Sequence, residues 1–208
     1  GTWNPTGSSP EFGIWALIIG TLKITVIATI VAVPIGLGAA IYLNEYASDR
    51  SRRIIKPILE ILAGIPTIVF GFFALTFVTP ILRNLIPNLG EFNSISPGIV
   101  VGIMIVPMIT SMSEDAMSSV PDKIREGAFG LGATKFEVAT KVVLPAATSG
   151  VVASIVLGIS RAIGETMIVS LAAGSSPTSS LSLTSSIQTM TGYIVEIATG
   201  DAAFGSDI

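Results

Sequence analysis

The chain has 208 residues, of which 50% are hydrophobic and only 12% are charged, and its formal net charge at pH 7 is −3. Soluble domains carry about 25% charged residues. With a mean hydropathy of +0.78, the composition therefore favours a membrane protein over a buried soluble bundle. The chain lacks Cys and His, which excludes a disulfide framework and argues against a metal site. The charge balance gives no support to nucleic-acid binding.

Four apolar stretches predict an all-α, polytopic transmembrane bundle. Each is close to or above the roughly 20 residues that span a bilayer, and Pro34, Pro66 and Pro107 predict kinks within them. The opening residues GTWNPTGSSPEFG lack the basic region of a signal peptide. We expect one permease domain over 1–208, with spans at about 12–43, 54–82, 97–113 and 146–173.

The basic residues outside the apolar stretches predict the orientation. Cytoplasmic loops are enriched in Lys and Arg, and two alternate segments of this chain hold eight such residues, whereas the opposite segments hold only Arg83. This pattern places the segment 114–145 in the cytoplasm, and the N-terminus and the segment 174–208 outside. The eight residues are Arg50, Arg52, Arg53, Lys56, Lys123, Arg125, Lys135 and Lys141.

The cytoplasmic segment contains the signals of two short helices joined by a tight turn. Pro121 and Asp122 suit a helix start, Gly132 can adopt the left-handed conformation that ends a helix, and Thr134 with Glu137 has the spacing of a capping box. A helix-turn-helix that binds DNA is excluded because residues 121–145 carry four basic and three acidic side chains. From these residues alone, an ordinary loop packed under the bundle and a functional segment remain equally open.

This segment resembles the cytoplasmic signature of ABC importer permeases, E-A-A, three residues, G, nine residues, I-x-L-P. All gaps of the signature are preserved, and two positions depart from it, with Gly127 for the first alanine and Val142 for the isoleucine. The resemblance implies that the segment docks into a cleft of an ATPase subunit and transmits its closure to the membrane helices. The ATPase-coupling residues that it implies are Glu126, Gly127, Ala128, Gly132, Leu144 and Pro145.

Nearly the whole chain is similar to phosphate importer permeases, and more to the PstC subunit than to PstA. The runs KPILEILAGIP and RAIGETM carry most of this preference. The resemblance implies a type I ABC importer permease in a bacterial or archaeal inner membrane. The partners that it implies are a PstA-like second permease, two PstB-like ATPase subunits and an external PstS-like phosphate-binding protein. Members of that family usually have six spans, so we expect the first and last to be missing here.

Arg161 and Glu165 lie near the middle of the fourth apolar stretch, where ionisable residues indicate function by default. Their i, i+4 spacing predicts that they share one helix face and can pair. A ridge of small residues on the neighbouring face, Gly150, Ser154, Gly158 and Ala162, predicts packing against another helix. Arg161 could offer its planar donor fork to an oxyanion, with Glu165 holding the arginine when no ligand is present. The alternative is a structural salt bridge that fixes helix register. The phosphate-permease resemblance favours the substrate path.

Two further intramembrane charges give weaker signals. We expect Lys23 to extend towards the outer interface and Glu60 to pair with Lys56 at i+4.

No Walker A sequence occurs, since the dipeptide Gly-Lys is absent. We expect a non-catalytic subunit without a cofactor of its own, whose partner ATPase binds ATP-Mg. The predicted function is phosphate import. Alternatives are a permease for another oxyanion such as sulfate or molybdate, a non-ABC carrier, or a passive membrane scaffold.

Overall fold

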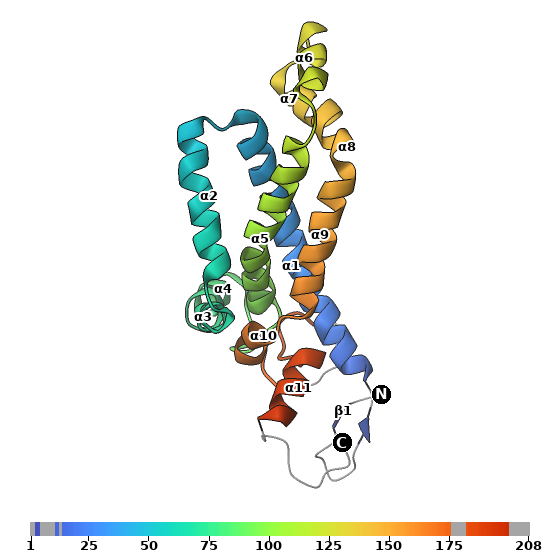
Figure 1. Cartoon of the computed structure of the whole chain (residues 1–208). Coiled ribbons are helices and arrows are strands. Elements are labelled where there is room, and N and C mark those ends of the chain that lie inside the picture. The colour runs from blue at the N-terminus through green and yellow to red at the C-terminus, as the bar shows by residue number, and fades with distance from the viewer. Residues whose placement is uncertain (1–2, 5–10, 13, 176–181, 200–208) are drawn as a thin grey trace. The chain divides into compact units, whose positions relative to one another are not determined.

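The computed structural model describes residues 3–4, 11–12, 14–175 and 182–199 and is almost entirely helical (Figure 1). The only strands in these ranges are β1 (Trp3–Asn4) and β2 (Glu11–Phe12), which pair antiparallel. The helices are α1 (Trp15–Ile41), α2 (Asp49–Gly64), α3 (Thr67–Phe73), α4 (Thr79–Leu85), α5 (Ile95–Ser118), α6 (Asp122–Gly130), α7 (Lys135–Glu137), α8 (Leu144–Ala146), α9 (Thr148–Ile163), α10 (Met167–Ala172) and α11 (Met190–Ala198), with π-helical segments η1 (Tyr42–Tyr46), η2 (Ala74–Val78) and η3 (Val138–Val143).

The predicted all-α, multi-pass architecture is confirmed. Three continuous helical stretches are long and apolar enough to cross a membrane, at Trp15–Tyr46, Thr67–Leu85 and Ile95–Ser118. A fourth span results if Lys135–Ala146 and Thr148–Ile163, which meet at a bend of 75°, are taken as one. Because a helix of about 20 residues spans the hydrocarbon core, three to four crossings agree in number with the four predicted apolar stretches. The fourth candidate runs over 135–163, however, and not over the predicted 146–173.

The second predicted span, 54–82, is not one helix. The helix α2 ends at Gly64, and α3 begins at Thr67 after Pro66, whose φ of −58° and ψ of 139° are extended. Proline lacks an N–H group and disfavours the helical conformation of the residue before it, so the break falls at this position. The candidate span therefore begins at Thr67. The helices α1 and α5 continue through Pro34 and Pro107.

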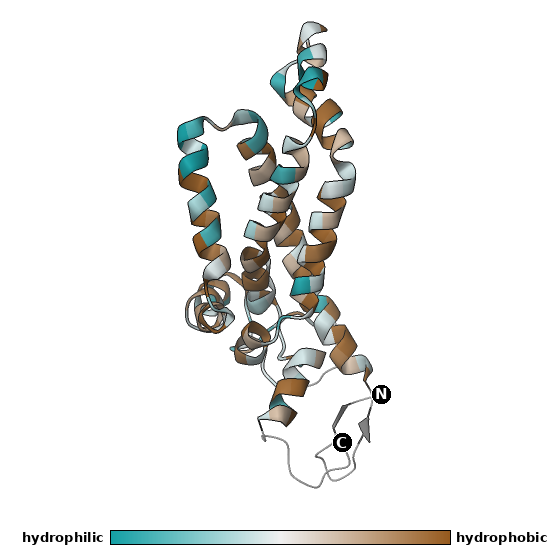
Figure 2. Ribbon diagram, in the orientation of Figure 1, coloured by the Kyte–Doolittle hydropathy of each residue, from teal (hydrophilic) through white to brown (hydrophobic). Residues whose placement is uncertain are grey.

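The chain divides into two compact units. The first unit comprises residues 1–29, 65–103 and 161–208, and the second comprises 30–64 and 104–160. In the second unit, hydrophilic residues gather along α6, α7 and the first turns of α2 (Figure 2). The apolar core beneath them is made by Ala40, Met117, Val120, Val138, Val143, Ala147 and Val151.

The small-residue ridge of α9 packs against α5 in the second unit, as predicted. A side chain on Gly158 would meet Ile109 of α5 at 2.9 Å, and one on Gly150 would meet Ala116 at 2.5 Å. Between these two contacts the hydroxyls of Ser154 and Ser113 lie 2.7 Å apart. Close approach of small residues is the usual way in which membrane helices associate, so this ridge fixes α9 on α5.

Enlarging the ridge should destabilise the permease. We expect Gly158→Leu to lower the free energy of unfolding by about 1–3 kcal/mol, because the added side chain overpacks the contact with Ile109. The matched control is Gly38→Leu, since a side chain on Gly38 of α1 would meet no atom within 4 Å. Thermal unfolding of the purified permease measures both variants, and equal melting temperatures would contradict the packing.

In the first unit, α3 and α10 lie in close contact through a glycine. A side chain on Gly71 would meet Leu171 at 2.7 Å. The Thr79 hydroxyl donates to Ser96 at 2.8 Å, and the N–H of Ser96 donates to Asn93 at 2.8 Å. At the start of α11, the Thr189 hydroxyl accepts a hydrogen bond from the Gly192 N–H at 3.1 Å.

Candidate functional site

The cytoplasmic segment folds into the two predicted short helices with a left-handed turn between them. The helix α6 ends at Gly130, and Gly132 has a φ of +85°. Glycine adopts this conformation without the steric cost that a side chain incurs. Thr134 and Glu137 form the predicted capping box, in which the Thr134 hydroxyl accepts from the Glu137 N–H and the Glu137 carboxylate accepts from the Thr134 N–H. The segment thus has a defined local shape.

Hydrogen bonding stabilises the charged form of Glu137. The backbone N–H of Thr134, then the Lys141 ammonium and the Thr134 hydroxyl, lower the pKa of Glu137 from 4.5 to about 2. Because the folded pKa is below the unfolded one, this contribution to stability is complete at neutral pH and is lost as the pH falls through about 2. The capping box therefore persists across the physiological pH range.

Apolar side chains are exposed on this polar segment. Leu131 is 91% exposed and Phe136 68% exposed, and Ile124 and Phe129 are also exposed. By contrast, Val138 and Val143 of η3 are buried in the core. Apolar side chains that are exposed on a segment outside the membrane are available for contact with a partner protein.

The signature residues differ in burial. Glu126, Gly127, Gly132 and Pro145 are exposed, whereas Ala128 and Leu144 are half-buried against the core of the second unit. A groove of about 400 Å³ is lined by Ala128, Gly132 and residues of η3. The segment therefore offers an outer surface for a partner, and its inner side chains attach it to the helices beneath.

Arg161 and Glu165 do not share a helix face, which corrects the expected pairing. The helix α9 ends at Ile163, so Glu165 lies beyond its end. The Glu165 carboxylate is buried and accepts hydrogen bonds from the N–H groups of Met167 at 3.1 Å and Ile168 at 3.3 Å. These are unpaired donors of the first turn of α10, so Glu165 caps that helix.

Arg161 is left exposed at the last turn of α9. Among the described residues, it forms neither an ion pair nor a hydrogen bond through its side chain. A guanidinium on an apolar helix without an acidic partner keeps all five of its donors available. The structure thus separates the two residues that the sequence pattern had joined.

The capping role of Glu165 can be tested by two substitutions. We expect Glu165→Ala to lower the free energy of unfolding by about 0.5–2 kcal/mol, the usual cost of removing a helix cap. Glu165→Gln should cost less, because its amide oxygen still accepts hydrogen bonds from Met167 and Ile168. Thermal unfolding of purified protein separates the two, and a Gln variant as unstable as the Ala variant would favour a role for the negative charge.

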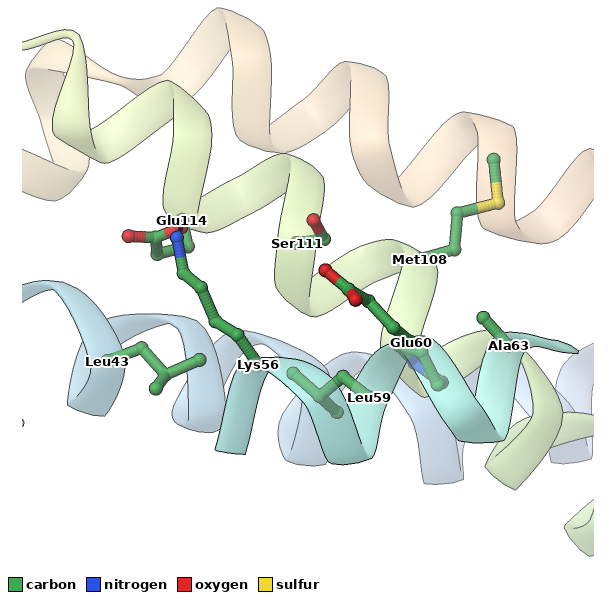
Figure 3. A pocket seen from close by; sticks show the side chains of 9 residues that line it. Leu43, Lys56, Leu59, Glu60, Ala63, Met108, Ser111 and Glu114 are labelled. Carbon is green, nitrogen blue, oxygen red and sulfur yellow. Dashed lines mark ion pairs between the residues drawn. The ribbon is translucent and has the colours of Figure 1, made fainter. Parts of the chain in front are cut away.

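The other intramembrane charges also have different partners from those expected. Lys56 pairs with Glu114 of α5 at 2.9 Å rather than with Glu60. Both acids border a cavity of about 260 Å³ (Figure 3), where Lys56 extends from α2 to Glu114 and Glu60 is directed towards Ser111. Lys23 is buried, and its ammonium donates to the Ser182 carbonyl at 2.9 Å; its extension towards the outer interface stays a prediction. Sequence spacing could not reveal these long-range pairs.

The membrane-spanning helices and the exposed helix pair together define a multi-pass inner-membrane permease of the type I ABC importer fold. The chain belongs to the family of binding-protein-dependent transport system inner membrane components, which matches residues 32–204. Permeases of this family are membrane components of transporters and are not themselves catalytic.

Curated relatives carry the similarity across most of the chain. The "Probable ABC transporter permease protein YqgH" of Bacillus subtilis (strain 168) is 36% identical over 205 residues, which are 98% of this chain and 66% of the relative. The PstC phosphate transport system permease proteins of Haemophilus influenzae and Pasteurella multocida are 37% and 39% identical, over 84% and 83% of this chain and 61% and 59% of those relatives. The chain therefore spans less than two thirds of the length of each.

Solved structures support the same fold. The chain resembles the MetNI methionine ABC transporter in inward-facing conformations, with a TM-score of 0.62 and 22% identity over 78% of this chain and 76% of that one in the native crystal form. In a second crystal form of that transporter, the TM-score is 0.55 at 21% identity, over 73% and 68% of the two chains. At these identities the likeness concerns the fold alone.

Proposed function

We propose that the chain is part of the transmembrane subunit of an ATP-driven importer of inorganic phosphate. In this role it forms part of the translocation path and couples to a separate ATPase subunit. The guanidinium of Arg161, exposed and without a partner among the described residues, is the observation that carries the proposal, and the similarity to PstC proteins supports it. A planar arginine fork can bind phosphate, as it binds carboxylates, with two parallel charge-assisted hydrogen bonds.

An arginine without an internal partner suits a transport site. A guanidinium already paired with a carboxylate would have to lose that partner before it could bind an anion, and breaking a buried ion pair costs several kcal/mol. Since Glu165 is engaged in capping α10, it does not compete with the substrate. Arg161 can therefore bind and release an oxyanion without exchanging a salt bridge.

The cytoplasmic helix pair supports coupling to an ATPase. The exposed residues Leu131 and Phe136 provide apolar contact area, and Glu126 provides an exposed charge beside them. The inner residues Ala128 and Leu144 pack against the core of the second unit, so a force on the outer surface reaches the membrane helices. Closure of an ATPase dimer would thus move these helices and alter access to Arg161.

The complete transporter needs partners that this chain does not supply. We infer a PstA-like second permease, two PstB-like ATPase subunits that bind ATP-Mg, and an external PstS-like binding protein that delivers phosphate. The basic residues of α2 and of the cytoplasmic segment 114–145, called the coupling segment from here on, orient both towards the cytoplasm. The N-terminus of the chain then lies outside.

Uptake by cells that express the intact permease with its neighbouring transport genes tests the substrate. We expect uptake of labelled phosphate that stops when ATP is depleted and is not reduced by excess sulfate or molybdate. Competition by either of those anions would favour another oxyanion permease. Uptake that follows an ion gradient after ATP depletion, or failure of the permease to co-purify with an ATPase, would favour a carrier or a scaffold of a different class.

A further inference from the structure

Arg125 connects the coupling segment to two neighbouring elements of the second unit. Its side chain is only 14% exposed although α6 lies at the surface. An arginine presents five donors in a rigid fork, and here the fork is filled. Nε donates to the Glu45 carboxylate at 3.2 Å, Nη2 to the Asn44 side chain at 3.1 Å and the Met117 carbonyl at 2.7 Å, and Nη1 to the Val120 carbonyl at 2.6 Å and the Asp122 carboxylate at 3.2 Å.

These contacts attach α6 to η1, at the end of α1, and to the last turn of α5. The carbonyls at a helix C-terminus have no partner within the helix, and Arg125 satisfies Met117 in that turn of α5. The segment η1 is a π-helical turn, a rare geometry that often occurs at functional positions. Its Leu43 carbonyl accepts a further hydrogen bond from Arg52 of α2 at 2.7 Å.

From Arg125 the hydrogen bonds continue without interruption to α2. The Asn44 side-chain amide donates to the Ser118 hydroxyl at 2.8 Å, and Ser118 donates to the Glu114 carboxylate at 3.2 Å. The other oxygen of Glu114 pairs with the Lys56 ammonium at 2.9 Å. The path therefore runs from α6 through η1 and α5 to α2, and all of its residues belong to the second unit.

The burial of Arg125 and Glu114 within this path favours joint movement of the elements that they contact. Glu114 is 3% exposed, and a buried carboxylate that loses its partner is strongly destabilised. If α6 moved alone, Arg125 would leave two carbonyls and the Glu45 carboxylate without donors, each at a free-energy cost. Displacement of α6 together with η1, α5 and α2 preserves every bond.

We propose that Arg125 and Glu114 are positioning residues of a polar relay that transmits movement of the coupling segment to α2. The relay is the path Arg125–Asn44–Ser118–Glu114–Lys56, and its far end is the cavity that Glu60 and Ser111 also line (Figure 3). This role rests on the proposed ATP-driven import. The apolar packing of Ala128 and Leu144 is a first connection between the coupling segment and the core of the second unit. The relay adds a second connection, made of hydrogen bonds, whose geometry is directional.

The test is the number of ATP molecules hydrolysed per phosphate imported, measured in proteoliposomes that contain the intact permease, its partner subunits and the binding protein. Arg125→Lys keeps the charge but cannot reproduce the five-donor fork, and Glu114→Gln removes the ion pair with Lys56. We expect each to raise the ATP cost per phosphate about fivefold or more, the lower range of allosteric coupling. The double variant should be no worse than the more affected single one, because both interrupt one path.

Matched controls are available on α2 and α5, two of the helices that the relay connects. Arg53→Lys on α2 and Asp115→Asn on α5 make the same chemical changes at exposed positions outside the relay, and both should retain the wild-type ratio. The relay would be overturned if Arg125→Lys and Glu114→Gln both kept the wild-type ratio of ATP hydrolysed to phosphate imported. It would also be overturned if the increase of this ratio in the double variant were the product of the increases in the two single variants. If a single variant fails to assemble, the exchange of Lys56→Glu with Glu114→Lys decides: a restored ratio supports the relay, and an unrestored ratio contradicts it.

These outcomes are separate from failure of the proposed function. A wild-type complex that imports no phosphate when ATP is supplied would contradict the proposed function itself. The relay alone would be contradicted if the wild-type complex imported phosphate normally and the Arg125→Lys and Glu114→Gln variants coupled ATP hydrolysis to import as well as the wild type does.

Discussion

Replacing Arg161 with alanine is expected to abolish most phosphate uptake while leaving the permease assembled. The guanidinium is exposed and has no intramolecular partner among the described residues, so its removal leaves no described group without its partner. Each charge-assisted hydrogen bond to the anion contributes about 1.5–3 kcal/mol, so the loss of one bond should reduce uptake at low phosphate about 10- to 100-fold. Initial rates of labelled phosphate uptake measure the change.

Two further substitutions define the role of Arg161. Arg161→Lys retains the charge but not the planar fork and should recover only part of the uptake. Arg83→Ala removes an exposed arginine from the last turn of α4 and should leave uptake unchanged. An Arg161→Ala variant with wild-type uptake, at equal amounts in the membrane, would remove Arg161 from the translocation path.

Replacing Gly132 with valine is expected to uncouple ATP hydrolysis from transport. With a φ of +85°, this position requires a conformation that is a pronounced outlier for a β-branched residue. A side chain there would meet no atom within 4 Å, so the effect arises from the backbone and not from a clash. The turn between α6 and α7 should therefore open and displace the helix pair, with a loss of coupled uptake of about 5- to 150-fold for a strain of roughly 1–3 kcal/mol.

The control for Gly132 lies in the same segment. Gly127 occupies the interior of α6 at ordinary helical angles, and a side chain there would also meet no atom within 4 Å. Gly127→Ala should stabilise the helix by up to about 1 kcal/mol and preserve uptake. Phosphate-stimulated ATPase activity and uptake are measured on both variants, and normal coupling in Gly132→Val would show that the turn geometry is dispensable.

Local signals in the sequence predicted local structure well. The capping box of Thr134 and Glu137, the left-handed Gly132 and the packing of the small-residue ridge on α5 are all present. Each of these depends on residues within a few positions of one another or on a periodic pattern along one helix. The apolar stretches likewise predicted the multi-pass helical fold.

The pairing of charges could not be predicted in the same way. The i, i+4 rule paired Arg161 with Glu165 and Lys56 with Glu60. The rule applies only within a continuous helix, and the i+4 carboxylate competes for the cation with every other acceptor nearby. The helix α9 ends before Glu165, whose carboxylate is nearer to the free N–H groups of α10. Lys56 meets Glu114 across 58 positions of the chain. Such contacts depend on tertiary packing, which one sequence does not specify.

The central claim, that this chain belongs to the membrane subunit of an ATP-driven phosphate importer, is tested most directly by reconstitution. The intact permease is purified with its partner subunits, placed in proteoliposomes with ATP inside and supplied with labelled phosphate and the binding protein outside. We expect phosphate to accumulate inside only when ATP, Mg²⁺ and the binding protein are all present. Accumulation that is independent of ATP, or ATP-driven accumulation of sulfate or molybdate in place of phosphate, would contradict the claim.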